Sequence, residues 1–233
     1  MTNLVASWSA PSHISALTTS LELGNLALHV NDDPNAVLNN RQKLRMQLGL
    51  KNEPVWLNQT HSNRCVRVEE ETLRDADAAI TRSSEHPLVI MTADCLPILL
   101  CNDKGTEIAA IHAGWRGLLN GIIENTLVKM KSKPMFAWIG PGICNQCFQI
   151  GSEVKEAFNQ HYPFMHDAFH VKNNKHHANL ALMAQLILNH SGVPKVTQSN
   201  ACTVEEKDRF YSYRREAQTG RMATLIWFNK EPQ

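Results

Sequence analysis

Apolar residues recur along the chain in two spacings, one typical of strands and one typical of helices. The segments 88–91, 96–101 and 107–111 are short, largely apolar and β-prone, which is the pattern of buried strands. Between the second and third of these segments, Asp103-Lys104-Gly105 has the composition of a tight turn. The pattern therefore predicts a hairpin of 96–101 with 107–111, preceded by another buried strand.

Helical spacing begins clearly after Asp33, which can cap a helix whose first position is Pro34 and which ends before Gly49. Arg41 would lie on the edge of this helix. Similar patterns predict further helices over 118–130, 152–159 and 178–190, and further strands over 136–139 and 222–228. Hairpins mixed with helices favour the α+β class over a simple doubly wound sheet.

Length and charge narrow the possible functions. The chain of 233 residues contains no linker, repeat or low-complexity stretch, so we expect a single domain over 1–233. Its 23 basic and 22 acidic residues are interspersed and give a net charge of +1, which offers no footprint for nucleic acid or an anionic membrane. The N-terminus has no signal-peptide pattern, and we expect a cytoplasmic protein whose six cysteines are free thiols or ligands.

The predicted hairpin brings a cysteine close to a histidine. A turn centred between Asp103 and Lys104 places Cys95 opposite His112, and a small shift of the turn would still leave them neighbours. His61 lies upstream, where an apolar-leaning strand meets a polar turn, which is a suitable position for a third ligand. Two imidazoles and a thiolate favour zinc or copper, and three protein ligands leave a position open, as in catalytic zinc sites.

Several motifs carry a resemblance to a known family. The segments TADCLPILL, AAIHAGWRGLLNGI, AWIGPGI and FYSYRREAQTGRMATLIW resemble the YfiH/laccase-domain family, first described as multicopper polyphenol oxidases and later as zinc-dependent purine nucleoside phosphorylases. The resemblance extends from about Arg41 to Trp227. It implies a four-layer fold of two packed mixed β-sheets flanked by helices, and a metal-binding triad at His61, Cys95 and His112.

The sequence departs from the family pattern at a few positions. Thr60 and Ser62 flank His61 where relatives more often have Val and Gly. Asn179 stands where many relatives carry an acid, and an amide could not replace that acid as a base.

The resemblance implies a reaction and further site residues. The expected reaction converts adenosine, inosine, guanosine or 5′-methylthioadenosine plus phosphate to base and ribose 1-phosphate, with adenosine deamination as a side activity. Phosphate favours arginine ligands, and Arg41, Arg116 and Arg214 are the candidates, with Arg41 favoured by the resemblance. Gln59 could bind the purine or ribose, and Asp94 could act as a base, orient a ligand or cap a turn. The expected partners are purine nucleoside and phosphate, and the expected assembly is a monomer or homodimer.

Three alternatives stay open. A copper-dependent polyphenol oxidase follows from the older family name, although the multi-histidine pairs of such enzymes are missing, since the chain has no His-x-His. A hydrolase could use Cys95 as nucleophile and His112 as base, which leaves His61 without a role. A structural zinc in a binding protein usually needs four ligands. Cys144-Asn145-Gln146-Cys147 resembles a redox or zinc pair, but no second CxxC accompanies it, and its role stays unassigned.

Overall fold

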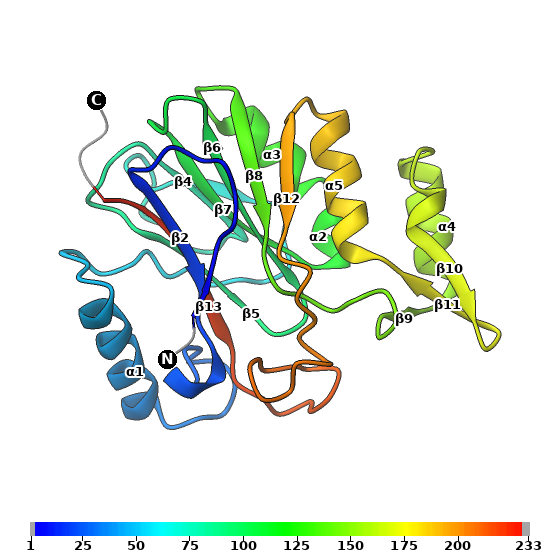
Figure 1. Ribbon diagram of the computed structural model, residues 1–233, viewed down its shortest axis with the longest axis horizontal. Helices are drawn as coiled ribbons and strands as arrows, with labels where there is room; N and C mark the ends of the chain where they lie inside the picture. Colours follow the sequence, from blue (N-terminus) through cyan, green and yellow to red (C-terminus); the bar gives the residue numbers. More distant parts are fainter. Residues whose placement is uncertain (1–2, 230–233) are drawn as a thin grey trace.

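The computed structural model describes residues 3–229 and shows two packed β-sheets with helices outside them (Figure 1). The smaller sheet has the order β1-β2-β13-β5 and is antiparallel: β1 (Leu4–Val5), β2 (Ile14–Thr18), β13 (Met222–Phe228) and β5 (Leu88–Thr92). The larger sheet has the order β12-β8-β6-β7-β4-β3 and is mixed: β12 (Lys195–Gln198), β8 (Pro134–Ile139), β6 (Leu96–Asn102), β7 (Ile108–Ala113), β4 (Ala78–Thr81) and β3 (Cys65–Arg67).

Helices cover both outer faces. These are α1 (Pro34–Gln47), α2 (Trp115–Leu119), α3 (Ile122–Lys129), α4 (Ser152–His161) and α5 (Leu180–His190), with the short 3-10 turns η1 (Leu21–Leu23) and η2 (His166–Ala168). A third small sheet, β10-β11-β9, lies beside α4: β10 (Phe169–Lys172), β11 (Lys175–Ala178) and β9 (Gln149–Ile150). Within residues 3–229, none of the helices combines the length and the apolarity that crossing a membrane requires.

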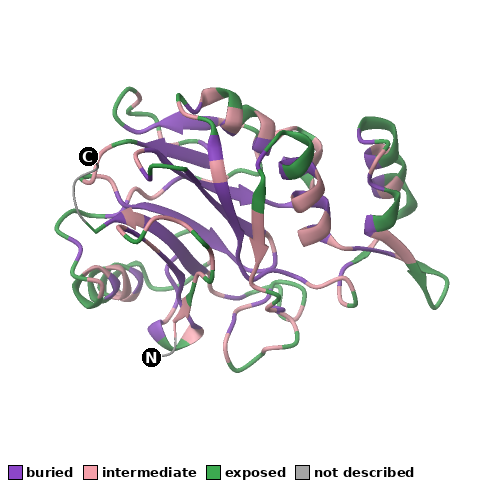
Figure 2. Ribbon diagram, turned by 45° about the horizontal axis from the view of Figure 1, so that its top comes forward, coloured by how far each residue is buried: buried purple, intermediate pink, exposed green. Residues whose placement is uncertain are grey.

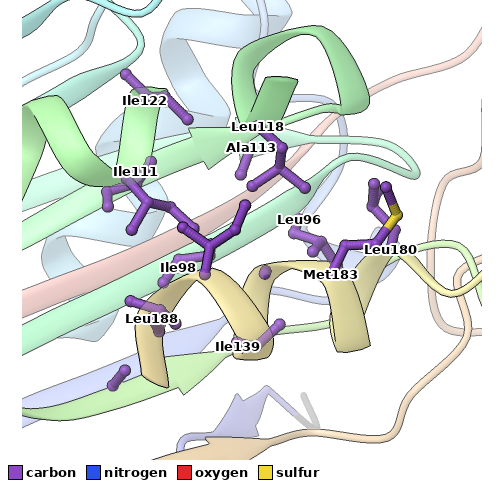
Figure 3. Packing of buried hydrophobic residues seen from close by; sticks show 14 of the residues in the cluster. Leu96, Ile98, Ile111, Ala113, Leu118, Ile122, Ile139, Leu180, Met183 and Leu188 are labelled. Carbon is purple, nitrogen blue, oxygen red and sulfur yellow. The ribbon is translucent and has the colours of Figure 1, made fainter. Parts of the chain in front are cut away.

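Three apolar clusters hold the layers together. The cluster between the sheets joins residues such as Ile90 and Ile226 of the smaller sheet to Leu99 and Trp138 of the larger one. A second cluster packs α2, α3 and α5 on the other face of the larger sheet, where Met183 and Leu188 of α5 lie over its strands (Figure 3). A third packs α1 on the smaller sheet. Figure 2 shows the resulting buried strands at the centre. The predicted α+β fold with two packed sheets and outer helices is confirmed, although the smaller sheet is antiparallel rather than mixed.

The hairpin forms as predicted, but its register differs. Pro97, not Cys95, lies opposite His112, because the turn is centred one residue later than expected. The Asn102 side chain accepts hydrogen bonds from the backbone N–H groups of Thr106 and Glu107, and Gly105 takes a φ of 62°. These bonds draw the chain tightly around Asn102 and delay the start of the second strand to residue 108. Cys95 therefore lies just outside the ladder, beyond the first strand pair.

The predicted helix over 118–130 is wrong as a single element. Gly121 has a φ of 80°, and this left-handed residue separates α2 from α3. Two other helix starts follow the expected capping rules. At the start of α1, Asp33 precedes Pro34, and its side chain accepts a hydrogen bond from the N–H of Asn35. At the start of α5, the Asn179 side chain accepts one from the N–H of Leu182.

A network around Glu71 ties α3 to the edge of the larger sheet and predicts an acid-sensitive contribution to stability. Glu71 accepts from Lys129 Nζ at 2.5 Å, from the Arg67 N–H at 2.9 Å and from Arg64 at 3.0 Å. These contacts, first of all the bond from Lys129, lower the pKa of Glu71 to about 2. Stability from this carboxylate is therefore present above pH about 4.5, the ordinary value, and is lost as the pH falls towards 2.

We expect Glu71→Gln to lower stability at pH 7 by about 1 kcal/mol, a fall in Tm of roughly 2–4 °C. The difference in Tm between this variant and the unmodified protein should shrink as the pH is lowered from about 5 towards about 2. This is roughly the range between the ordinary pKa and the lowered pKa of Glu71. Glu70→Gln is the matched control, because Glu70 is 56% exposed and its ion pairs with Arg67 and Lys131 are longer, at 3.5 and 3.2 Å. A pH-independent loss in Glu71→Gln would contradict the interpretation.

Candidate active site

The three predicted metal ligands meet at the open end of the hairpin. His61 lies in the loop before β3, Cys95 directly precedes β6, and His112 is in β7. One ligand atom of each lies within 4.8 Å of the others, and Cys95 Sγ is 3.8 Å from His61 Nε2. The rings of His61 and His112 meet edge to face, with centroids 4.8 Å apart. We call these three residues the His-Cys-His cluster.

A glycine makes room for this approach. Gly114 precedes α2, and a Cβ added to it would lie 2.9 Å from Cys95 Sγ and 3.2 Å from the His61 ring. Contacts this short do not occur in ordinary packing, so a side chain at 114 would push the two ligands apart. Gly114 thus has a steric role in the approach of Cys95 and His61.

Asp77 holds both histidines of the cluster in position through hydrogen bonds. Its buried carboxylate accepts from His112 Nδ1 at 2.7 Å, which fixes the ring and leaves Nε2 directed to the cluster. The same carboxylate accepts backbone N–H bonds from Thr60, His61 and Ser62 at 3.2, 3.0 and 2.6 Å, and the Ser62 hydroxyl donates at 2.6 Å. Ser62, one of the departures from the family pattern, therefore adds a bond to this acid.

The loop of residues 58–64, which carries His61 and which we call the ligand loop, is held in an unfavourable conformation. His61 has a φ of 60°, in the left-handed region that residues with a side chain seldom adopt. The three N–H bonds to Asp77 converge on this turn and offset the strain. The position of His61 is therefore fixed by the backbone before any ligand binds.

The electrostatics favour charged forms inside the cluster. Burial alone would raise the pKa of Asp77, but the bonds from His112 and Ser62 outweigh burial and lower it. Burial would also raise the pKa of Cys95, yet the two nearby imidazoles lower it, while Cys95 and Asp77 raise the pKa of His112 against burial. A thiolate at Cys95 is the form that binds metal ions and also the form that acts as a nucleophile.

The cluster opens onto a cavity of about 400 Å³. One wall is apolar and includes Ile143, Phe148 and Leu180. Met91, Ala93 and Trp115 add further apolar lining. Besides the cluster, the polar and charged lining residues include His29, Gln59, Asp94, Arg116, Tyr213, Arg214 and Arg221. A cavity of this size with an apolar wall and a few polar groups suits a small molecule.

Two predicted site residues, Arg116 and Gln59, both line the cavity, but they differ in whether their side chains are already hydrogen-bonded within the protein. Arg116 is exposed and stacks on Trp115 at 4.3 Å, and its guanidinium has no hydrogen-bond partner within residues 3–229. Gln59 makes two bonds of 2.8 Å to the backbone of Met91, one donated and one accepted. Its amide is therefore committed to joining the ligand loop to β5.

Asp94 and Arg214 are joined to each other. Asp94 has a φ of 87°, and its carboxylate accepts from the Thr203 hydroxyl and from the Arg214 N–H, both at 2.6 Å. The Arg214 guanidinium donates to the carbonyls of Cys147 and Gln149. Of the roles considered for Asp94, the observed contacts correspond to fixing a turn and its neighbouring loops.

Arg41 lies one layer behind the cavity. It stacks on Trp56 at 3.8 Å, donates to the Leu26 carbonyl at 2.9 Å and contacts the sulfur of Met91 at 3.7 Å. Met91 lines the cavity, but Arg41 is not among the lining residues. The helix that carries it forms as predicted, and the structure places its guanidinium against the back of the wall.

Among the charged and imidazole groups of this site, sequence reasoning missed Asp77, His29 and Arg221, and it also missed the apolar and aromatic lining such as Phe148 and Tyr213. Asp77 had a detectable signal, because it is an acid inside the apolar run Ala76 to Ile80. His29 and Arg221 lie in loops far apart in the sequence and gave no such signal. Burial and the charges of Arg221 and Arg41 lower the pKa of His29, which keeps this imidazole neutral near pH 7.

Comparisons with known proteins identify the family. The model of the multi-copper polyphenol oxidoreductase laccase family matches residues 14–229, so the chain belongs to this family. It is 40% identical to a purine nucleoside phosphorylase of Haemophilus influenzae, covering 95% of this chain and 97% of that protein. It is 36% identical to the purine nucleoside phosphorylase YfiH of Escherichia coli K12, covering 96% and 98%. The predicted membership in the YfiH/laccase-domain family is confirmed.

Solved structures support the same fold. The crystal structure of the Neisseria meningitidis protein NMB0706 superposes with a TM-score of 0.93 at 40% identity, covering 99% of this chain and 100% of that one. The crystal structure of a Bacillus licheniformis YfiH protein gives a TM-score of 0.83 at 27% identity, covering 92% of each chain. Together with the family match, the His-Cys-His cluster indicates a metal-binding protein.

The Asp77 network predicts a specific loss on mutation. We expect Asp77→Asn to reduce metal affinity roughly 10–100-fold, because an amide cannot hold the His112 ring and the His61 turn as the carboxylate does. Competition with a chromogenic chelator measures this affinity. Asp75→Asn is the matched control, since Asp75 is exposed and, within the described part of the chain, its side chain bonds to Asn58 and not to the cluster. Unchanged affinity in Asp77→Asn would show that the carboxylate only supports the fold.

Proposed function

We propose that this protein is a zinc-dependent purine nucleoside phosphorylase, which converts a purine nucleoside and phosphate to the free base and ribose 1-phosphate. The observation that carries the proposal is the His-Cys-His cluster, with three potential ligands, opening onto a cavity that has both cationic and apolar walls. The names of the Haemophilus influenzae and Escherichia coli relatives support it. Adenosine deamination at the same site is the proposed side activity.

The donor set fits zinc. His61 would bind through Nε2 and Cys95 through its sulfur, while His112 would bind through Nε2 because Nδ1 is held by Asp77. Three protein ligands leave room for one more on the cavity side. Bound there, zinc would supply Lewis acidity, which assists departure of a purine and activation of water.

Phosphate requires cations that are not already committed. Arg116 is the best placed, because its guanidinium lies on the cavity wall, stacked on Trp115 but without a hydrogen-bond partner among residues 3–229. Arg221 lies nearby but donates to the carbonyls of Thr219 and Gly220, and Arg214 donates to Cys147 and Gln149. We propose that Arg116 holds phosphate in position to attack C1′ of the ribose. As the C1′–O bond to phosphate forms, the C1′–N9 bond breaks; its electron pair stays on the purine, which takes up the proton that hydrogen phosphate loses.

The apolar wall suits the nucleoside base. Phe148 and Leu180 offer flat and aliphatic surfaces against which a purine can pack, and the exposed ring of Tyr213 also lines the cavity. Neutral His29 can both donate and accept a hydrogen bond, as recognition of a ribose hydroxyl or purine nitrogen requires. We propose these residues as the nucleoside subsite of a single-domain protein that works as a monomer or homodimer without nucleic acid.

The older oxidase interpretation has less support. Multicopper oxidases need a cluster of many histidines beside a Cys-His site. Across residues 3–229, the second group of potential ligands consists of cysteines and a glutamate, with no histidine. The proposed phosphorylase needs one metal at one cluster, which this geometry can accommodate.

The decisive experiment combines metal analysis, activity and alkylation. We expect zinc at the His-Cys-His cluster and phosphate-dependent release of base from adenosine or inosine, with both lost in Cys95→Ala. Zinc should shield Cys95 from iodoacetamide until a chelator removes the ion, and zinc added to unmodified apoprotein should restore activity. Cys101→Ala is the control, because this buried thiol lies outside the cluster, and burial raises its pKa to about 12.

Other outcomes would favour specific alternatives. Rapid alkylation of Cys95 in the untreated protein, with activity indifferent to chelator, would replace the zinc mechanism by a cysteine hydrolase. Copper in place of zinc, with oxidation of phenols and no release of base, would support the oxidase.

The arginines can be separated by their effects on phosphate. We expect Arg116→Ala to raise the KM for phosphate by roughly 10–100-fold, the value of a charge-assisted hydrogen bond of about 1.5–3 kcal/mol. Adenosine deamination should change much less, because it uses no phosphate. Arg41→Ala is the comparison, since Arg41 was the candidate favoured by the family resemblance and is bonded behind the wall. A larger phosphate effect in Arg41→Ala would assign phosphate binding to Arg41 instead.

A further inference from the structure

A second group of metal-binding side chains lies outside the His-Cys-His cluster. One ligand atom from each of Cys144, Cys147, Cys202 and Glu205 lies within 4.8 Å of the others. Cys202 is buried, the other two cysteines are half-buried, and Glu205 is exposed. We call these four residues the three-cysteine cluster. It shares no residue with the proposed catalytic site.

The topology of the larger sheet brings the two loops of this cluster together. Strands β8 and β12 are parallel neighbours, so the loops that follow them leave the same edge of the sheet. The backbones pair directly: the Gly142 N–H donates to the Ala201 carbonyl at 3.3 Å, and the Thr203 N–H donates to the Gly142 carbonyl at 3.1 Å. The two loops are thus held in register next to the cysteines.

Each loop presents its two ligands at the same spacing. Cys144 and Cys147 are three residues apart in a turn closed by bonds from the Cys147 and Phe148 N–H groups to the Cys144 carbonyl, at 3.1 and 3.0 Å. Cys202 and Glu205 are also three residues apart. The sequence contains no second Cys-x-x-Cys motif, but Cys202 and Glu205 form a Cys-x-x-Glu motif that lies next to the first pair. Paired turns of this kind are typical of structural zinc sites.

The contacts within the cluster suit a tetrahedral metal. Zinc–sulfur bonds of about 2.3 Å hold sulfurs about 3.8 Å apart in a tetrahedron. The ligand atoms of the cluster lie within 4.8 Å of one another, so none of these separations needs to close by more than about 1 Å. Cys147 Sγ lies 3.8 Å from Glu205 Oε1. The Cys144 N–H donates to Cys202 Sγ at 3.4 Å, a bond that stabilises a thiolate.

From this geometry we propose that Cys144, Cys147, Cys202 and Glu205 bind a second zinc ion, at a structural site. Four protein ligands complete its coordination and leave no position for a substrate. Three thiolates and a carboxylate around zinc carry net negative charge. Arg214 donates to the Cys147 carbonyl at 3.1 Å and Arg215 to the Thr203 carbonyl at 2.9 Å, which places a guanidinium on each loop to offset that charge.

The second zinc would fasten one wall of the cavity. Phe148 follows directly after Cys147 in one loop, and Arg214 lies in the other, and both line the cavity. Asp94 connects the same loops to Cys95, since its carbonyl accepts from Ile143 and its carboxylate from Thr203 and Arg214. Loss of this ion should therefore loosen the cavity wall without removing a ligand from the His-Cys-His cluster.

Metal stoichiometry of the full-length protein tests the proposal independently of any activity. Protein purified with reductant, loaded with zinc and freed of excess ion should contain two zinc ions per chain, one for each cluster. Cys147→Ser and Cys95→Ala should each lose one ion, and the double variant should lose both. Cys101→Ala is again the control and should keep both. With cobalt in the Cys95→Ala protein, a strong thiolate-to-metal absorption should appear, and it should vanish when Cys147→Ser is added.

A second variant covers the case in which Cys147→Ser fails to fold. Glu205→Gln alters an exposed side chain, and it should release one zinc ion to a chelator concentration that the unmodified protein withstands. Glu153→Gln, an exposed glutamate at the start of α4, should not. Metal content that stays unchanged in both Cys147→Ser and Glu205→Gln would overturn the proposal. So would a disulfide between two of these cysteines, detected in the purified protein as a mass lower by two hydrogens.

Discussion

The carboxylate of Asp77 is the interaction on which the geometry of the candidate active site depends. It is a buried charge, which is tolerable only because five donors from two segments of the chain, residues 60–62 and His112, converge on it. One of these donors orients the His112 ring, and the others hold the His61 turn in a left-handed conformation. A single anion therefore fixes two ligands that lie in different parts of the sequence, and both are in place before a metal arrives.

The layered fold makes this convergence possible. Strand β7 presents His112 from the interior of the larger sheet, while Gln59 joins the His61 loop to β5 of the smaller sheet through two bonds to Met91. The apolar layer between the sheets sets their separation and thus the reach between the ligands. Asp94 extends the same framework to the loops that close the far side of the cavity. The side chains of Gln59, Arg214 and Arg221 are bonded to backbone groups, which leaves Arg116 as the cation most available to a ligand.

Much of the fold follows from local patterns in the sequence. The buried strands, the capped helix α1 and the hairpin could be predicted because apolar periodicity and capping residues act over a few positions. The register of the hairpin could not, because it depends on the Asn102 side chain bonding across the turn. Similarly, Gly121 divides a helical pattern that apolar spacing alone makes continuous. The proximity of Cys95 to His112 was expected from the hairpin, but Asp77, His29 and Arg221 reach the site through tertiary packing that a one-dimensional pattern does not contain.

The path of the chain between the two sheets has a consequence for how this protein can vary in length. Strand β5 belongs to the smaller sheet and β6 to the larger, and the chain crosses between them in three residues, Ala93, Asp94 and Cys95. An inserted or deleted residue here would rotate Cys95 away from the histidines and break the contacts of Asp94 at the same time. The other end of the hairpin is an exposed turn at Asp103 and Lys104, where extra residues would change the local bonds of Asn102 but lie far from the cluster. The same hairpin is therefore rigid in length at one end and permissive at the other.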